Sequence, residues 1–208
     1  MMFGRRFSLV CLLLASWSLP QFALSAQPHA KTAPVFSSSG KQHPAPGTSI
    51  THFTQVDTSV YLGSKPKSSA DFEFLRSKNI RYILNVKFLP FLTGPEKAKA
   101  KRYGIEFLSV PMNASPVAPC EKHVDEALRM MRTHQPIYVH CVLGRDRTNL
   151  LGGLYRMYFL GVPRQKAWSE MKQDGFRDAW FLKGLSHYFE KHPTAPPDLA
   201  DLAEPAGR

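Results

Sequence analysis

Cysteine, acidic residues and long apolar runs are all scarce in this chain. Only three of the 208 residues are cysteine, too few for a fold built on disulfide bonds. Asp and Glu number 16 against 27 Lys and Arg, which gives a formal net charge of +11. Such a charge is typical of proteins that bind phosphate-bearing ligands, anionic surfaces or nucleic acid, although solvated Lys-rich faces contribute to it. The sequence shows no nucleic-acid motif, so we expect no nucleic-acid partner.

No uninterrupted apolar run reaches the roughly 20 residues that a membrane-spanning helix needs. The first residues instead combine Arg5 and Arg6, an apolar stretch over residues 7–19 and small residues up to Ala26, the pattern of a secretory signal peptide. We therefore expect a signal peptide over residues 1–26 and a mature protein without a stable membrane anchor, periplasmic or secreted. Removal of the signal peptide takes away two arginines and no acidic residue, so the formal net charge of the mature protein is +9.

The remaining chain divides into one domain with two loose ends. Residues 27–50 and 193–208 are rich in Pro and small residues without apolar periodicity, so we expect a flexible lead-in and a flexible tail. Between them, strand and helix patterns alternate over residues 51–192, a length that forms a single core and, we expect, a monomer. The alternation predicts an α/β fold with a central, mostly parallel, twisted sheet flanked by helices. Ligands of such sheets bind beyond the carboxyl ends of the strands.

The stretch IYVHCVLGRDRTNLLGG places a short loop between a predicted strand and a predicted helix that begins at Thr148. Backbone N–H groups at a helix start have no intrahelical partner and form an anion site with the positive end of the helix dipole. Cys141 lies at the edge of this loop, where the same field favours the nucleophilic thiolate. Arg147 supplies a planar fork that matches two phosphate oxygens. These residues predict a thiolate next to a bound phosphate.

The segment HCVLGRDRT resembles the signature of the cysteine-dependent tyrosine and dual-specificity phosphatases, in which His-Cys is followed by five residues and then Arg-Ser/Thr. The order of elements over residues 51–192 also looks like the small bacterial, exported members of that superfamily. The resemblance implies a dual-specificity-phosphatase-like fold and a reaction without metal or cofactor. It implies that Cys141 attacks phosphorus to give a cysteinyl-phosphate, while Arg147 and the loop amides hold the phosphate. The loop residues that would bind substrate are Val142, Leu143, Gly144, Arg145, Asp146 and Arg147.

Two further roles follow from the same resemblance. Thr148 is expected to hydrogen-bond the sulfur and help it leave, and His140 to orient the loop from behind. His140 fits a satisfied core histidine equally well.

The general acid departs from the usual pattern of the family, because the loop that should carry an Asp has Asn113 instead. An amide cannot donate and recover a proton at useful pH. Phosphatases of the myotubularin and Sac types carry Asp directly before the signature Arg, as the sequence DRT does here. We therefore predict that Asp146 is the general acid. The alternatives are that Asp146 caps the helix or pairs with Arg145, and that the acid is Glu121, Asp125 or the substrate itself.

Three functions remain open from the sequence. The first is a phosphatase for a small, highly phosphorylated molecule such as an inositol polyphosphate, of the phytase type, favoured by the extra Arg145 and by Lys65, Lys67 and Lys87. The second is a protein tyrosine or dual-specificity phosphatase that acts on a phosphoprotein. The third is a non-catalytic phosphate-binding module or a thiol redox protein that uses Cys120 and Cys141.

Overall fold

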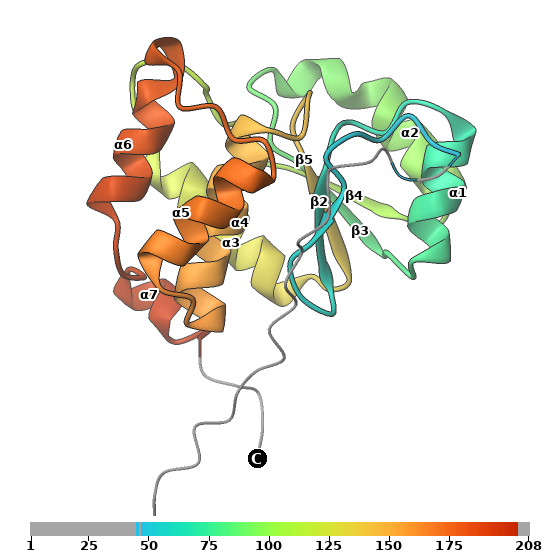
Figure 1. Cartoon of the computed structure of the whole chain (residues 1–208). Helices are drawn as coiled ribbons and strands as arrows, with labels where there is room; N and C mark the ends of the chain where they lie inside the picture. The colour runs from blue at the N-terminus through green and yellow to red at the C-terminus, as the bar shows by residue number, and fades with distance from the viewer. Residues whose placement is uncertain (1–44, 46, 204–208) are drawn as a thin grey trace, which may run out of the picture. The chain divides into compact units, whose positions relative to one another are not determined.

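The computed structural model describes residues 45 and 47–203, so the expected signal peptide and most of the lead-in lie outside the described residues. A five-stranded sheet has the order β1-β2-β5-β3-β4 (Figure 1). β1 runs antiparallel to β2, and the other neighbours are parallel. The strands are β1 (Thr54–Gln55), β2 (Val60–Gly63), β3 (Tyr82–Asn85), β4 (Glu106–Ser109) and β5 (Ile137–His140). The predicted α/β class and mostly parallel sheet are confirmed.

Helices cover both faces of the sheet (Figure 1). One face carries α1 (Ser69–Ser77) and α2 (Gly94–Arg102), and the other carries α3 (Glu121–Thr133), α4 (Asp146–Leu160), α5 (Arg164–Gln173) and α6 (Lys183–Lys191). Shorter elements are η1 (Pro90–Thr93), η2 (Trp180–Leu182) and α7 (Pro197–Ala200). Among the described residues, none of these helices has the length and apolarity needed to cross a bilayer.

The central strand β5 contributes to both halves of the core because successive side chains of a strand point to opposite faces. Ile137 and Val139 belong to the hydrophobic cluster that includes residues of α3, α4, α5 and α6, while Tyr138 belongs to the cluster that includes residues of α1 and α2. All four residues of β5 are buried, as expected for a strand covered by helices on both faces.

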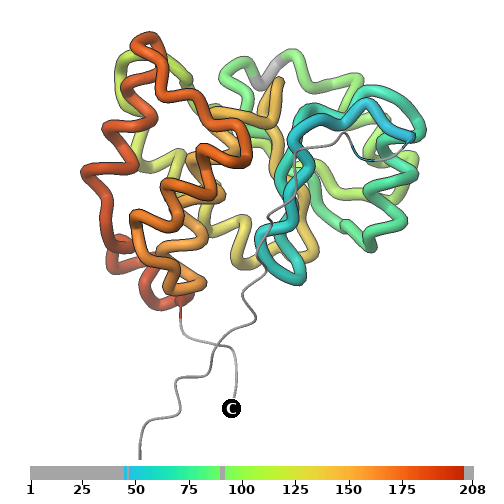
Figure 2. The backbone as a smooth tube through the Cα atoms, viewed as in Figure 1, coloured from blue at the N-terminus to red at the C-terminus, as the bar shows by residue number. Residues whose placement is uncertain are grey.

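Strand register brings the site together. His140 pairs with Gly63 on one side and with Asn85 on the other, so three strands end level with one another. Figure 2 shows the segments after β3 and β5 turning at this common edge, at the top of the view. The loops that leave the carboxyl ends therefore meet in space.

The folded part extends past the expected boundaries at both ends. Ile50 of the expected lead-in is fully buried, and Leu199 of the expected tail is fully buried in α7. α7 is tied to α3, because Arg129 Nη2 donates to Asp198 Oδ2 at 2.6 Å and Arg132 Nε donates to the Leu202 carbonyl at 2.9 Å. Isolated apolar residues among prolines and acids thus find places in the core that sequence periodicity does not indicate.

One helix boundary also differs from the sequence expectation. α4 begins at Asp146, two residues before the expected start at Thr148.

Asp71 fixes the start of α1 and the loop before it. Its buried carboxylate accepts hydrogen bonds from Ser49 N and Oγ, Lys67 N and Ser68 N, at 2.6–2.8 Å. Burial raises the pKa of this carboxyl, but the hydrogen bonds from Lys67, Ser68 and Ser49 outweigh burial, and the net pKa is lowered. The β2–α1 loop, which carries Lys65 and Lys67, is thereby held in place.

We predict that Asp71→Asn lowers the free energy of unfolding by about 2–3 kcal/mol at neutral pH, the value of one or two hydrogen bonds to a charged group. Because the folded-state pKa is lowered, the contribution of Asp71 is present above its ordinary pKa of 3.8 and is lost as the pH falls through the folded-state value. Urea denaturation at pH 7 and at successively lower pH values should show the gap between wild type and variant narrowing in acid. A gap that stays constant with pH would contradict this role.

Candidate active site

The loop of Cys141–Arg145 joins β5 to α4 and packs closely against the end of β2. Gly144 has φ of +69°, a left-handed conformation that favours glycine. A Cβ at this position would collide with the backbone of Gly63 and Ser64. The loop is also hydrogen-bonded to the segment after β2, since Lys65 N donates to the Val142 carbonyl at 3.2 Å. Glycine at position 144 is therefore required both by backbone conformation and by space.

His140 and Glu96 form a buried pair behind this loop. His140 Nε2 lies 2.7 Å from Glu96 Oε1, and both side chains are at most 1% exposed. Neither atom has another hydrogen-bond partner among the described residues. His140 Nδ1 lies 2.8 Å from the Cys141 carbonyl oxygen. Both ring nitrogens of His140 therefore face oxygen acceptors.

Glu96 also contacts two lysines. Lys87 Nζ donates to Glu96 Oε2 at 3.1 Å, and Lys65 Nζ lies 3.6 Å from the same oxygen. Burial raises the pKa of the Glu96 carboxyl, but His140 and Lys87 lower it by more, so the net pKa is lowered. One ionised carboxylate thus connects α2 to the ends of β2, β3 and β5.

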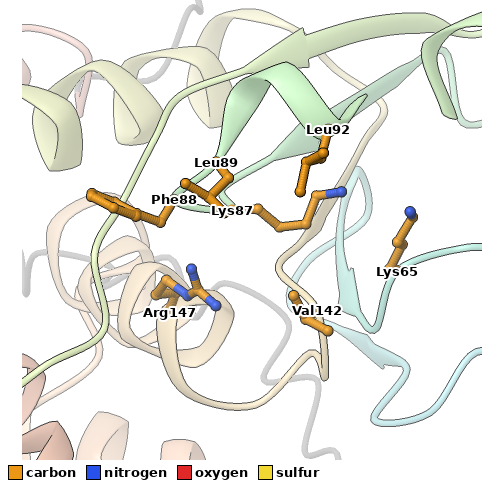
Figure 3. Close-up of a pocket in the computed structure, with 7 residues that line it drawn as sticks. All are labelled: Lys65, Lys87, Phe88, Leu89, Leu92, Val142 and Arg147. Atoms are coloured by element: carbon orange, nitrogen blue, oxygen red, sulfur yellow. The ribbon is translucent and has the colours of Figure 1, made fainter. Parts of the chain in front are cut away.

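Arg147 lines a pocket of about 420 Å³ at this edge of the sheet. Its Nη1 donates to the Met112 carbonyl at 3.1 Å, which holds one side of the guanidinium against the loop after β4. In Figure 3 the ends of Lys65 and Lys87 lie on one side of the pocket and the guanidinium of Arg147 on the other. Phe88, Leu89, Leu92 and Val142 complete the lining. Three cations therefore converge on one pocket next to the Cys141 loop.

Asp146 and Arg145 both bind the segment between α5 and α6. The carboxylate of Asp146, 6% exposed, accepts from Arg177 N at 3.2 Å, Nε at 3.1 Å and Nη2 at 2.5 Å. These hydrogen bonds raise the pKa of Arg177. Arg145 Nε donates to the Gly175 carbonyl at 2.9 Å. Asp146 thus begins α4 without making a side-chain cap, and its partner is Arg177 rather than Arg145.

The loop after β4 uses Asn113 to hold its own shape. The Asn113 amide donates to Ser115 Oγ at 3.2 Å and to the Val117 carbonyl at 3.1 Å. Glu121 Oε1 lies 3.6 Å from His192 Nε2, so its partner comes from the end of α6. Burial, with the nearby charges of Asp198 and Glu121, raises the pKa of Asp125. The neighbours of Glu121 and Asp125 belong to the α6 and α7 side of the molecule rather than to the Cys141 loop.

The sequence profile of the family described as "Dual specificity phosphatase, catalytic domain" matches residues 60–189. This match spans more than half of the chain and includes the whole Cys141 loop. The chain belongs to the dual-specificity phosphatase family. The predicted resemblance to the dual-specificity phosphatases is confirmed, and the protein is a cysteine-dependent phosphatase.

Individual proteins similar to this chain are also phosphatases. The dual specificity protein phosphatase TpbA of Pseudomonas aeruginosa is 26% identical over 180 residues, which cover 85% of this chain and 78% of TpbA. The crystal structure of P. aeruginosa TpbA covers 79% of this chain and 96% of its own, with a TM-score of 0.59 and 22% identity. The core catalytic domain of the S. cerevisiae PP-IP phosphatase Siw14 covers 73% of this chain and 90% of its own, with a TM-score of 0.62 and 22% identity.

Thr148 has no hydrogen-bond partner, and Cys120 and Cys141 form no disulfide, among the described residues. The hydroxyl of Thr148 is buried and makes no hydrogen bond to the Cys141 sulfur or to any other described residue. A buried hydroxyl without a partner costs about 1–3 kcal/mol, so this group is available to a ligand or an intermediate. Cys120 and Cys141 are both free thiols, the first exposed at the start of α3 and the second buried.

Exposed apolar side chains surround the phosphatase site. The large apolar residues that the described chain leaves exposed lie in the loops after β3, β4 and β5 and in η2; they are Phe88, Leu89, Leu92, Val117, Val142, Leu143, Trp180 and Phe181. The η2 loop reaches the same edge because Arg177, bound to Asp146, packs over the Phe181 ring at 5.7 Å from the centroid. The pocket opening is therefore both cationic and apolar.

Sequence reasoning missed two residues of the site, Glu96 and Arg177. Glu96 is the lone acid in the Lys-rich segment over residues 94–104, which reads as a solvated polar helix. Its position in the first turn, directly after Pro95, was the one available signal, because the first turn of a helix favours acidic residues. Arg177 stands in a loop without any motif, and only the fold brings it to Asp146.

We predict that Gly144→Ala lowers turnover of an aryl phosphate by about 100-fold or more, the effect of misplacing transition-state donors. Gly104→Ala is the matched control, because Gly104 has φ of +70° but an added Cβ there would meet no atom within 4 Å. Both variants carry the same backbone strain, and only the first collides with Gly63 and Ser64. Equal loss of activity in the two variants would show that the close contact with β2 is unimportant.

Proposed function

We propose that this phosphatase acts on an inositol polyphosphate or a similarly small, multiply phosphorylated molecule through a cysteinyl-phosphate at Cys141. The observation that carries the proposal is the pocket of Figure 3, where Lys65 and Lys87 face Arg147. A single phosphate needs Arg147 and the loop amides, and two further ammonium groups supply charge for more phosphate. The pocket also has an apolar wall, so it fits a compact ring better than an extended, fully hydrated chain.

The reaction divides into two displacements. In the first, the Cys141 thiolate forms a bond to phosphorus while the bond from phosphorus to the leaving oxygen breaks, and that oxygen takes a proton from a general acid. In the second, water attacks phosphorus and gives a proton to the conjugate base left by the first step, the bond from phosphorus to sulfur breaks to regenerate the thiolate, and inorganic phosphate leaves. Arg147 and the N–H groups over residues 142–147 stabilise the charge on the equatorial oxygens in both steps. The hydroxyl of Thr148 is proposed to bind the departing sulfur.

His140 is proposed to act through the loop rather than on the substrate. Its ring joins the Cys141 carbonyl to Glu96, so it fixes the backbone at the nucleophile.

The substrate class rests on likeness as well as on the pocket. Siw14, whose fold this chain shares, is a PP-IP phosphatase. TpbA is a dual specificity protein phosphatase, and its structure has been determined with pTyr, so a phosphoprotein is the second candidate substrate.

Residues 1–26 read as a signal peptide, and we propose that the enzyme acts in the periplasm or outside the cell.

Asp146 remains the proposed general acid. Among the described carboxylates, it is the one that belongs to the end of the Cys141 loop itself, whereas Glu96 is buried behind His140. To carry the proton, Asp146 must release at least one hydrogen bond from Arg177. The same pair could instead hold the segment between α5 and α6 against the loop, and the two roles make different predictions.

We predict that the enzyme releases inorganic phosphate faster from an inositol polyphosphate than from a phosphotyrosine peptide at matched concentrations. Cys141→Ser should abolish release from both substrates and still bind inorganic phosphate, because Arg147 and the loop amides persist while a hydroxyl there lacks an activating base. An assay of phosphate release measures turnover of the two substrates, and calorimetry measures the binding of inorganic phosphate to Cys141→Ser. Faster release from the peptide would contradict the proposed substrate and favour a phosphoprotein. Activity of Cys141→Ser near that of the wild type would refute the mechanism.

We predict that Asp146→Asn slows phenyl phosphate by about 100-fold or more and nitrophenyl phosphate by only a few-fold, because a poor leaving group depends on the acid. Arg177→Met is the companion variant, since it removes the pair and keeps the carboxylate. If Asp146 acts only by holding Arg177, both variants slow both substrates by the same factor. The ratio of the two rates therefore separates acid catalysis from positioning.

A further inference from the structure

A second hollow, of about 190 Å³, lies next to the pocket of Figure 3. Lys65, Lys67 and Lys99 line it, and Phe72, Pro66 and Pro95 form its walls. These lysines come from the β2–α1 loop and from α2, outside the Cys141 loop. The reaction described above uses neither Lys67 nor Lys99.

The charges of this hollow are not balanced by the protein. Neither Lys67 nor Lys99 has a carboxylate partner among residues 45 and 47–203. The carboxylate that also lines the hollow is Glu96, whose oxygens already face His140, Lys87 and Lys65. An anion entering the hollow would therefore meet an excess of positive charge.

Lys99 is held in position for such an anion. Its Nζ donates to the Lys67 carbonyl at 2.8 Å and lies 5.9 Å from the centroid of the Phe72 ring. An ammonium has three N–H donors, so two remain for a ligand. The Lys67 backbone is fixed in turn by Asp71, to which Lys67 N donates at 2.6 Å.

Lys65 connects the hollow to the active site, because it lines both the hollow and the pocket with Arg147. We propose that the hollow lined by Lys65, Lys67 and Lys99 is a second phosphate subsite, which holds another phosphate of a ligand whose scissile phosphate lies at Cys141. The ligand is a polyol with at least two phosphates on one compact ring. This inference rests on the proposed function and specifies the substrate class of the same site.

Two sources can supply this chemistry, a free inositol polyphosphate or the bisphosphorylated head group of a membrane lipid. The exposed apolar residues that line the pocket, such as Phe88 and Leu92, give a reason to examine the lipid source. The experiment therefore has a soluble arm and a vesicle arm.

The test is inhibition of nitrophenyl phosphate hydrolysis by inositol hexakisphosphate, with inositol monophosphate as the ligand that has a single phosphate. The variant is Lys67→Gln with Lys99→Gln. Its matched control is Lys97→Gln with Lys101→Gln, which removes the same charge from exposed positions of the α2 segment that do not line the hollow. We expect the first variant to weaken inhibition by the hexakisphosphate about ten-fold, the effect of one lost charge-assisted hydrogen bond. Inhibition by the monophosphate and uninhibited turnover should not change in either variant.

The outcomes separate the subsite from the proposed function. If the hexakisphosphate inhibits through Lys67 and Lys99 but releases no phosphate, the subsite stands and the proposed substrate falls. If it is hydrolysed and both double variants behave alike, the substrate stands and the subsite is refuted. In the vesicle arm, phosphatidylinositol bisphosphate replaces the soluble ligand, and the arm with the larger difference between the double variants identifies the source. Absence of a difference in both arms overturns the proposal.

Discussion

The buried carboxylate of Glu96 holds the active-site edge of this fold together. It is approached by His140 from β5, Lys87 from the segment after β3 and Lys65 from the segment after β2. Removing one partner of a buried ion pair leaves an uncompensated charge and costs about 3–5 kcal/mol. The contacts with Glu96 therefore fix the ends of β2, β3 and β5 relative to α2. His140 transmits that geometry to the Cys141 carbonyl, and the nucleophile loop takes its position from a residue on a helix far away in sequence.

The second constraint is steric and acts on the same loop from the other side. Gly144 lies against the Gly63 and Ser64 backbone, where even one methyl group would not fit. The loop is thus enclosed between β2 and the Glu96 cluster, and its amides have a fixed direction before any ligand arrives. Preorganised donors of this kind stabilise developing charge without the cost of reorganising at the moment of reaction.

The local part of this arrangement could be predicted from the sequence, and the non-local part could not. An apolar run, a Gly-containing turn and a helix start stand side by side in residues 136–160, so strand, loop and helix follow from neighbours in the chain. Glu96 and Arg177 depend on contacts between distant segments, and the patterns around them indicate only a solvated helix and a loop. The same reason explains α7, where Leu199 is buried through contact with α3 although its surroundings read as a tail.

Asn113, at the position where an acid was expected, has a structural part in the loop after β4. The Asn113 amide closes the loop after β4 through Ser115 and Val117, and the Met112 carbonyl of that loop accepts from Arg147. The loop therefore still serves the phosphate site, but as a support for the guanidinium and not as a proton donor. In the proposed mechanism, protonation of the leaving group falls to Asp146 at the start of α4, where its carboxylate is paired with Arg177. At this edge the carboxylate of Glu96 is buried, while the side chains of Arg147, Lys87 and Lys65 line the pocket. The pocket therefore presents positive charge to a ligand, as binding of a negatively charged phosphate ester requires.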